Sequence, residues 1–180
     1  MPAVPHSSSI RLRLRELAQL FNAMDPSPLT ERDLDAKAEE FIVSWARELS
    51  QATELELHIQ LEVSPAAEPA AQTEASVQQY FSSRTEMKVR EFRLLMRRGR
   101  TSLLVGLTFL VACLGISELL GTLGQSTASA IIRESLTIGG WVAMWRPLEI
   151  YLYDWWPLRD ERRVLDRLSR MKVRLVVPEK

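Results

Sequence analysis

Hydrophobic and polar residues alternate in three short stretches of the chain. These stretches are residues 10–15 (IRLRLR), 55–63 (LELHIQLEV) and 172–177 (KVRLVV). A period of two residues indicates β-strands with one buried face. The polar face is basic in the first stretch and acidic in the second, so neighbouring strands would match opposite charges. The pattern leaves parallel and antiparallel pairing open, and the third strand would join the C-terminus to the N-terminal domain.

Hydrophobic residues recur at helical spacing between residues 31 and 50. They are Leu34, Ala38, Phe41, Ile42, Trp45 and Leu49. This spacing predicts an amphipathic helix. Thr30 and Asp33 resemble a capping box at its start, although Asp replaces the usual Glu or Gln. The strands and the helix together predict a small α+β domain, with two or three strands, over residues 1–63.

The segment after this domain changes character twice before the apolar region. Residues 64–76 (SPAAEPAAQTEAS) are rich in Ala, Pro and small polar residues, which predicts a linker. Residues 77–100 contain no proline and predict a cytoplasmic helix that leads into the membrane, broken only at Gly99.

Two apolar stretches between residues 101 and 158 predict a transmembrane hairpin. Residues 101–123 contain one charged residue, Glu118, and about 20 apolar residues cross a bilayer core. A buried helix of a soluble protein is the alternative, but so small a domain could not surround it. Residues 128–158 include Arg146 and Glu149. Because a charge at mid-membrane costs about 2.5–3.5 kcal/mol, we expect this second helix to need protein partners. An interfacial or re-entrant segment is its alternative.

Basic residues predict the orientation of the hairpin. They cluster before the first span, at residues 88–100, and after the second, at residues 159–170, and the connecting loop near 121–130 has no Lys or Arg. The positive-inside rule therefore places both ends, including the tail at 159–180, in the cytoplasm. An aromatic belt is expected where the second helix leaves the bilayer, formed by Tyr151, Tyr153, Trp155 and Trp156.

Charged residues of the two spans fall at matching depths. A turn near 125–126 places Glu118 beside Arg133 at the outer boundary and Arg97 beside Asp154 at the cytoplasmic boundary, which predicts two rim ion pairs. Arg146 and Glu149 are three residues apart and share a helix face. They predict an intramembrane polar site, which is either a structural ion pair or a pathway lined by several copies of the chain.

Composition excludes several classes of function. The chain has 180 residues with 23 basic and 23 acidic side chains, so no basic field indicates nucleic acid. The single cysteine, Cys113, forms no intrachain disulfide. No nucleophile, phosphate-loop or metal motif is present. Asp25, Asp33 and Asp35 are close in sequence, and turn and cap chemistry explains them better than a cation does. The sequence therefore predicts no metal, no cofactor and no enzymatic activity.

Four segments together resemble a group of small bacterial inner-membrane proteins of unknown function. They are LFNAMDPSP (20–28), ERDLDAKAEEFIVSWA (31–46), RRGRTSLLVGLTFL (97–110) and GGWVAMWRPLEIYLYDWWPLR (139–159). The resemblance implies a bacterial inner-membrane location, and it supplies no catalytic or binding residues.

Three functional hypotheses follow from the sequence. The first is a non-enzymatic membrane protein, a homo-oligomer in the lipid bilayer that presents its small domain to a cytoplasmic protein partner. The alternative is a homo-oligomeric ion channel or small-solute transporter with its polar site at Arg146 and Glu149. The third is a lipid-modifying enzyme that uses Glu149, Asp154 and nearby Trp residues, and the missing catalytic constellations count against it.

Overall fold

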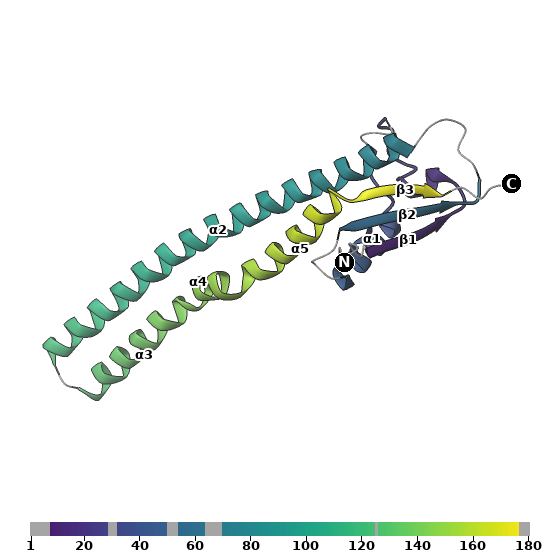
Figure 1. The fold of residues 1–180 in the computed structure, drawn as a ribbon. Helices are drawn as coiled ribbons and strands as arrows, with labels where there is room; N and C mark the ends of the chain where they lie inside the picture. Colours follow the sequence, from purple (N-terminus) through teal and green to yellow (C-terminus); the bar gives the residue numbers. More distant parts are fainter. Residues whose placement is uncertain (1–7, 29–31, 50–53, 64–69, 125, 177–180) are drawn as a thin grey trace. The chain divides into compact units, whose positions relative to one another are not determined.

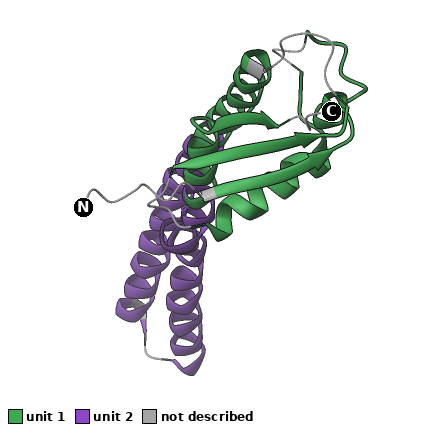
Figure 2. Ribbon diagram, turned by 45° about the vertical axis from the view of Figure 1, so that its right-hand side comes forward, with its two compact units in different colours: residues 1–89, 160–180 green, residues 90–159 purple. Residues whose placement is uncertain are grey.

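The computed structural model describes residues 8–28, 32–49, 54–63, 70–124 and 126–176. The chain divides into two compact units. Residues 1–89 and 160–180 form the sheet unit, and residues 90–159 form the hairpin unit (Figure 2). The sheet unit thus contains the segments that precede and follow the hairpin unit in the sequence.

A parallel three-stranded sheet is the centre of the sheet unit (Figure 1). The strands are β1 (Ser8–Leu14), β2 (Leu55–Leu61) and β3 (Lys172–Val176), in the order β1-β2-β3. Both pairings are parallel, with Ile10 opposite Leu57 and Leu57 opposite Val173. All three strands predicted from the alternating pattern form, and the C-terminal strand joins the sheet beside β2. Parallel neighbours require crossover connections. The connection from β1 to β2 contains α1 (Ala36–Glu48), and that from β2 to β3 contains the whole hairpin unit.

Charges on the exposed face of the sheet pair differently from the sequence expectation. The register places Glu56 of β2 opposite Ser9 of β1, so the residue directly across from this carboxylate is not an arginine. Glu56 instead lies 3.1 Å from His58 Nε2 and 3.4 Å from Arg174 Nη2 of β3. The hydrogen bond from His58 and the nearby Arg174 cation hold the pKa of Glu56 below its usual value. Arg13 of β1 donates to the neutral Gln60 of β2, at 2.9 Å.

Helix α1 (Ala36–Glu48) starts later than the predicted residue 31. Its N-cap is Asp35, whose carboxylate accepts hydrogen bonds from the backbone N–H groups of Lys37 and Ala38. The predicted capping box, with Thr30 as N-cap and Asp33 three residues later, does not start this helix, and Thr30 itself lies outside the described residues. Asp33 N–H donates to Asp25 instead, and this bond with those from Ser27 lowers the pKa of Asp25 to about 2. Turn and cap chemistry therefore accounts for the acidic cluster.

One hydrophobic cluster holds the sheet unit together. The inward face of β2 is fully buried, and side chains from α1, α2 (Ala70–Leu123) and α5 (Trp155–Leu168) complete the cluster. A short 3₁₀ helix, η1 (Leu17–Leu20), adds Leu20. Its largest fully buried members are Ile10, Leu20, Ile42, Leu57, Ile59, Val77, Phe81, Leu168 and Met171. Helices and strands distant in sequence are therefore joined by burial of apolar surface.

Helix α2 (Ala70–Leu123) is one continuous helix of 54 residues. The predicted linker is therefore wrong for residues 70–76, where Thr73 and Ser76 are buried on the sheet unit. The predicted break at Gly99 is also wrong. A Cβ at Gly99 would lie 2.9 Å from Ile150 Cγ2, so this glycine permits close approach of two helices within the hairpin unit.

The return path of the hairpin unit is divided into several helical segments. They are α3 (Thr127–Ala143), α4 (Trp145–Glu149), the π-helical segment η2 (Ile150–Asp154) and the start of α5. Ser126 caps α3 by accepting from Ser129 N–H at 3.2 Å. The division at Met144 has a covalent cause, because Pro147 lacks the N–H that would bond the carbonyl of Ala143.

Candidate functional site

Small residues set the contact between the two sides of the hairpin unit. A Cβ at Gly106 would lie 3.0 Å from the carbonyl oxygen of Ala143, and one at Gly140 would lie 2.9 Å from Leu110 Cδ1 and 3.2 Å from Cys113 Cβ. Close helix approach at small residues is typical of membrane helix pairs. These contacts have the register expected for a turn near residues 125–126.

Three charged side chains form a cluster on α4 and η2. Arg146 Nη1 lies 2.7 Å from Glu149 Oε2 and 3.4 Å from Asp154 Oδ2. The Arg146 side chain is 60% exposed, and Trp145 beside it is 73% exposed. The cluster therefore lies on an outward surface that is otherwise apolar. We refer to these three residues as the Arg146 cluster.

The π-helical segment explains why Asp154 belongs to this cluster. In a regular α-helix, residues eight apart are rotated by roughly 80° about the axis. A π-helical turn contains more residues than an α-turn and so reduces that rotation. The pairing of Asp154 with Arg146 was not predicted, since no sequence signal marks the π-helical segment.

The two rim ion pairs predicted from depth do not form in the part of the chain that the structure describes. Asp154 pairs with Arg146 rather than with Arg97. The guanidinium of Arg133 lies over Gly121, whose Cβ would be 3.0 Å from Arg133 Cζ, and the buried Nε atom has no hydrogen-bond partner. Glu118 is exposed. The two residues of each predicted pair were matched by their depth along the helices, and equal depth alone does not bring two side chains to the same helix face.

The predicted aromatic residues lie on η2 and the start of α5. Trp155 Nε1 donates to the carbonyl of Tyr151 at 2.9 Å, and the Arg159 guanidinium carbon lies 5.5 Å from the Trp155 ring centroid. Tyr153 and Trp156 are 70% and 63% exposed. This combination of ring, polar tip and cation is typical of side chains at a membrane interface.

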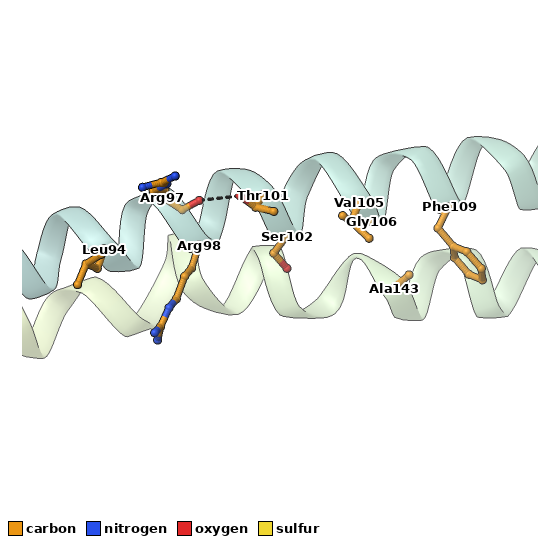
Figure 3. A pocket seen from close by; sticks show the side chains of 9 residues that line it. All are labelled: Leu94, Arg97, Arg98, Thr101, Ser102, Val105, Gly106, Phe109 and Ala143. Atoms are coloured by element: carbon orange, nitrogen blue, oxygen red, sulfur yellow. Dashed lines mark hydrogen bonds between the residues drawn. The ribbon is translucent and has the colours of Figure 1, made fainter.

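A groove runs along one face of α2 in the hairpin unit (Figure 3). Its volume is about 840 Å³. The lining residues are Leu94, Arg97, Arg98, Thr101, Ser102, Val105, Gly106, Phe109 and Ala143. All but Ala143 follow one another on α2 at steps of one or three residues, so they form one stripe of the helix. We call this feature the α2 groove; it has a basic end and an apolar end.

A hydrogen-bonded ion pair joins α1 to α2 in the sheet unit. Arg84 Nη2 lies 2.7 Å from Glu39 Oε2, and Tyr80 Oη donates to the same carboxylate at 2.8 Å. Burial opposes ionisation of Glu39, but the hydrogen bonds from Arg84 and Tyr80 outweigh it and lower the pKa of that carboxyl. Burial and the bond to Glu39 raise the pKa of Tyr80 well above 10.

This pair should make the stability of the chain depend on pH. Because the folded-state pKa of Glu39 is lowered, the contribution is complete above the unfolded-state pKa and is lost as pH falls through the folded-state pKa. We expect Glu39→Gln to reduce the free energy of unfolding by about 1–2 kcal/mol near neutral pH and to weaken its acid dependence. Thermal unfolding of the purified chain between about pH 3 and pH 7 measures both effects. Glu40→Gln, an exposed neighbour on α1, is the control and should leave the profile unchanged.

Two observations bound the kind of site this chain offers. Within the described residues, no group of three or more His, Cys, Asp or Glu side chains could hold a metal ion. Among the described helices, α2 alone is long and apolar enough to cross a membrane, and 22% of its most apolar stretch is buried.

Comparison of the chain with models of protein families, with curated proteins and with solved structures found no match.

Proposed function

We propose that this chain is a non-enzymatic membrane protein that crosses a bilayer twice, self-associates and holds its sheet unit at the cytoplasmic face. The length and outward apolar surface of α2 support the first crossing: Leu104, Val105 and Val111 are 67%, 63% and 61% exposed. A core helix of a soluble protein would bury such residues. The resemblance to small bacterial inner-membrane proteins favours that membrane as the location.

Strand β3 supports the second crossing. It pairs with β2, so residues before and after the hairpin unit belong to one sheet. If α2 crosses a bilayer, the chain must return to the starting side before residue 172. The segment from Thr127 to Trp156 is long enough, at ~1.5 Å per helical residue, for a core of ~30 Å. Its outward side chains include Trp141, Val142 and Trp145.

One observation carries the proposal of self-association, and it is the exposure of the Arg146 cluster. Pro147, next to Arg146, lies beside Gly106, which is ~13 Å along α2 from Arg97. With Arg97 at the cytoplasmic boundary, the backbone of Arg146 is therefore inside the hydrocarbon core, and its guanidinium extends toward Asp154 on the cytoplasmic side. Charges there are costly when they face lipid, and they occur where other protein or water covers them. A second copy of the hairpin unit supplies that cover.

Replacing Arg146 should weaken the assembly. We expect wild-type protein in lipid nanodiscs or mild detergent to form a defined oligomer, and Arg146→Leu to raise its dissociation constant at least roughly tenfold. Native mass spectrometry over a range of concentrations measures this change. Glu134→Gln, at an exposed residue of α3 outside the cluster, is the control. A wild-type chain that stays monomeric at every concentration would rule out the proposal.

A homo-oligomeric channel is the second candidate, and the position of the Arg146 cluster favours it. One hairpin encloses no lumen, so several copies would have to place the cluster on a shared axis. Ion flux into liposomes would then occur for wild-type protein and change with Arg146→Leu or Glu149→Leu. Absence of flux, or flux unaffected by both changes, would rule out a channel lined by the Arg146 cluster.

A further inference from the structure

We propose that the α2 groove binds one anionic phospholipid of the cytoplasmic leaflet, with the phosphate at Arg97 and Arg98 and an acyl chain along Val105 and Phe109. This inference rests on the proposed membrane crossing of α2. It adds a specific ligand site on a part of the hairpin unit that the Arg146 cluster does not use.

The basic end of the groove is suited to a phosphate group. Arg97 and Arg98 are both exposed, and neither lies within ion-pair distance of a carboxylate in the part of the chain that the structure describes. Asp154, which the hairpin register places at this depth, is paired with Arg146. Figure 3 shows the Arg98 guanidinium extending past the opposite ribbon and the Arg97 guanidinium on the other side of α2. Both side chains are long and exposed, so they can turn toward the groove and donate to the oxygens of one phosphate. Basic pockets on the cytoplasmic side of membrane helices bind lipid headgroups in this way.

The apolar end of the groove is suited to an acyl chain. From Arg97 to Phe109 the groove extends ~18 Å along the helix, close to the ~15 Å of one hydrocarbon leaflet. Gly106 and Ala143 have little or no side chain, which leaves the middle of the groove hollow. Figure 3 shows the Phe109 ring reaching toward the opposite ribbon, at the end distant from the arginines. Head and tail of a phospholipid therefore match the two ends in order and in length.

Polar groups between these ends match the ester region of a lipid. The Thr101 hydroxyl is satisfied by the carbonyl of Arg97, at 3.2 Å. Ser102 is half-buried, and Figure 3 shows its hydroxyl directed into the space between the ribbons. A hydroxyl in that place can donate to a glycerol ester oxygen. A free phosphate ion would contact only the basic end and leave the apolar end unfilled.

A second copy of the chain fits the groove less well than a lipid does. In a symmetric assembly about an axis normal to the bilayer, equivalent residues lie at equal depth. The arginines of one copy would then face arginines of the other, and like charges in contact oppose association. Charge complementarity therefore favours an anionic molecule that comes from the bilayer itself.

Competition between two lipids tests this site. The full chain is reconstituted in nanodiscs that contain equal amounts of phosphatidylglycerol and phosphatidylcholine with identical acyl chains, and native mass spectrometry measures the lipid that stays bound. We expect roughly tenfold retention of phosphatidylglycerol over phosphatidylcholine for the wild type. The double variant Arg97→Gln/Arg98→Gln should lose that preference.

A second double variant separates a built site from general attraction to basic residues. Arg93→Gln/Arg100→Gln removes the same charge from exposed residues of α2 outside the groove lining, and it should keep the preference. Equal loss in both double variants, no preference in the wild type, or a lipid-free dimer closed over the groove would overturn the proposal. A chain that fails to enter the nanodiscs at all would instead refute the membrane crossing on which the site depends.

Discussion

The variant Gly140→Cys should form an intramolecular disulfide with Cys113 in the presence of a membrane-permeant oxidant. A Cβ at residue 140 would lie 3.2 Å from Cys113 Cβ, and disulfides join Cβ atoms about 3.5–4.5 Å apart. A shift of a few tenths of an ångström is enough, because the other close atom, Leu110 Cδ1, ends a flexible side chain. We expect nearly complete loss of free thiol, measured by a mass-tagged maleimide added after denaturation.

The neighbouring variant Gly139→Cys provides a matched control. Apart from its chain neighbours and the adjacent backbone of α3, no atom lies within 4 Å of a Cβ at residue 139, so its thiol and that of Cys113 should both react with the maleimide. Because the two variants differ by one residue along α3, general proximity within the bilayer cannot produce a difference between them. Equal protection in both, or protection in neither, would contradict the packing of the hairpin unit.

A membrane-impermeant maleimide applied from the periplasmic side should label Gly124→Cys and leave Arg163→Cys unlabelled. Both residues are exposed, and Gly124 lies in the loop between α2 and α3 while Arg163 lies on α5. In a Cys113→Ala background each variant carries one thiol. Two crossings place the loop outside and Arg163 inside, so the expected contrast is nearly all-or-none.

Permeabilised cells are the control for this labelling. Both thiols should then react, which shows that Arg163→Cys is accessible once the barrier is removed. Labelling of Arg163→Cys in intact cells would refute the second crossing, and equal labelling of both variants without permeabilisation would refute membrane insertion altogether.

Local patterns predicted the elements of the sheet unit, and longer-range contacts determined their bounds. The alternation at residues 55–63 is visible in the sequence because each second residue of β2 is buried. The start of α1 is less visible, since Thr30, Asp33 and Asp35 are all good capping residues and only the loop held by Asp25 selects Asp35. Residues 70–76 have the composition of a linker, but burial of Thr73 and Ser76 makes them helical.

The candidate sites also combine features that the sequence pattern predicts with features that only the folded chain shows. A spacing of three residues on one helix was enough to predict the contact between Arg146 and Glu149. The contribution of Asp154 depends on a π-helical segment that no residue pattern announces. The α2 groove needs Ala143 from the other side of the hairpin unit, so its basic and apolar residues could be seen in the sequence while their common hollow could not.

The position of β3 has a consequence for how the protein is made. Ribosomes deliver β1 and β2 early, whereas the strand that completes the sheet emerges only after everything between residues 62 and 171. Until β3 has been synthesised, the sheet can contain only β1 and β2, and one edge of β2 stays unpaired. If the return segment of the hairpin unit failed to bring the C-terminus back, that edge would stay unpaired and the nascent chain would expose an open strand. Under the proposed double crossing, a single late step would therefore depend on both correct insertion and correct folding.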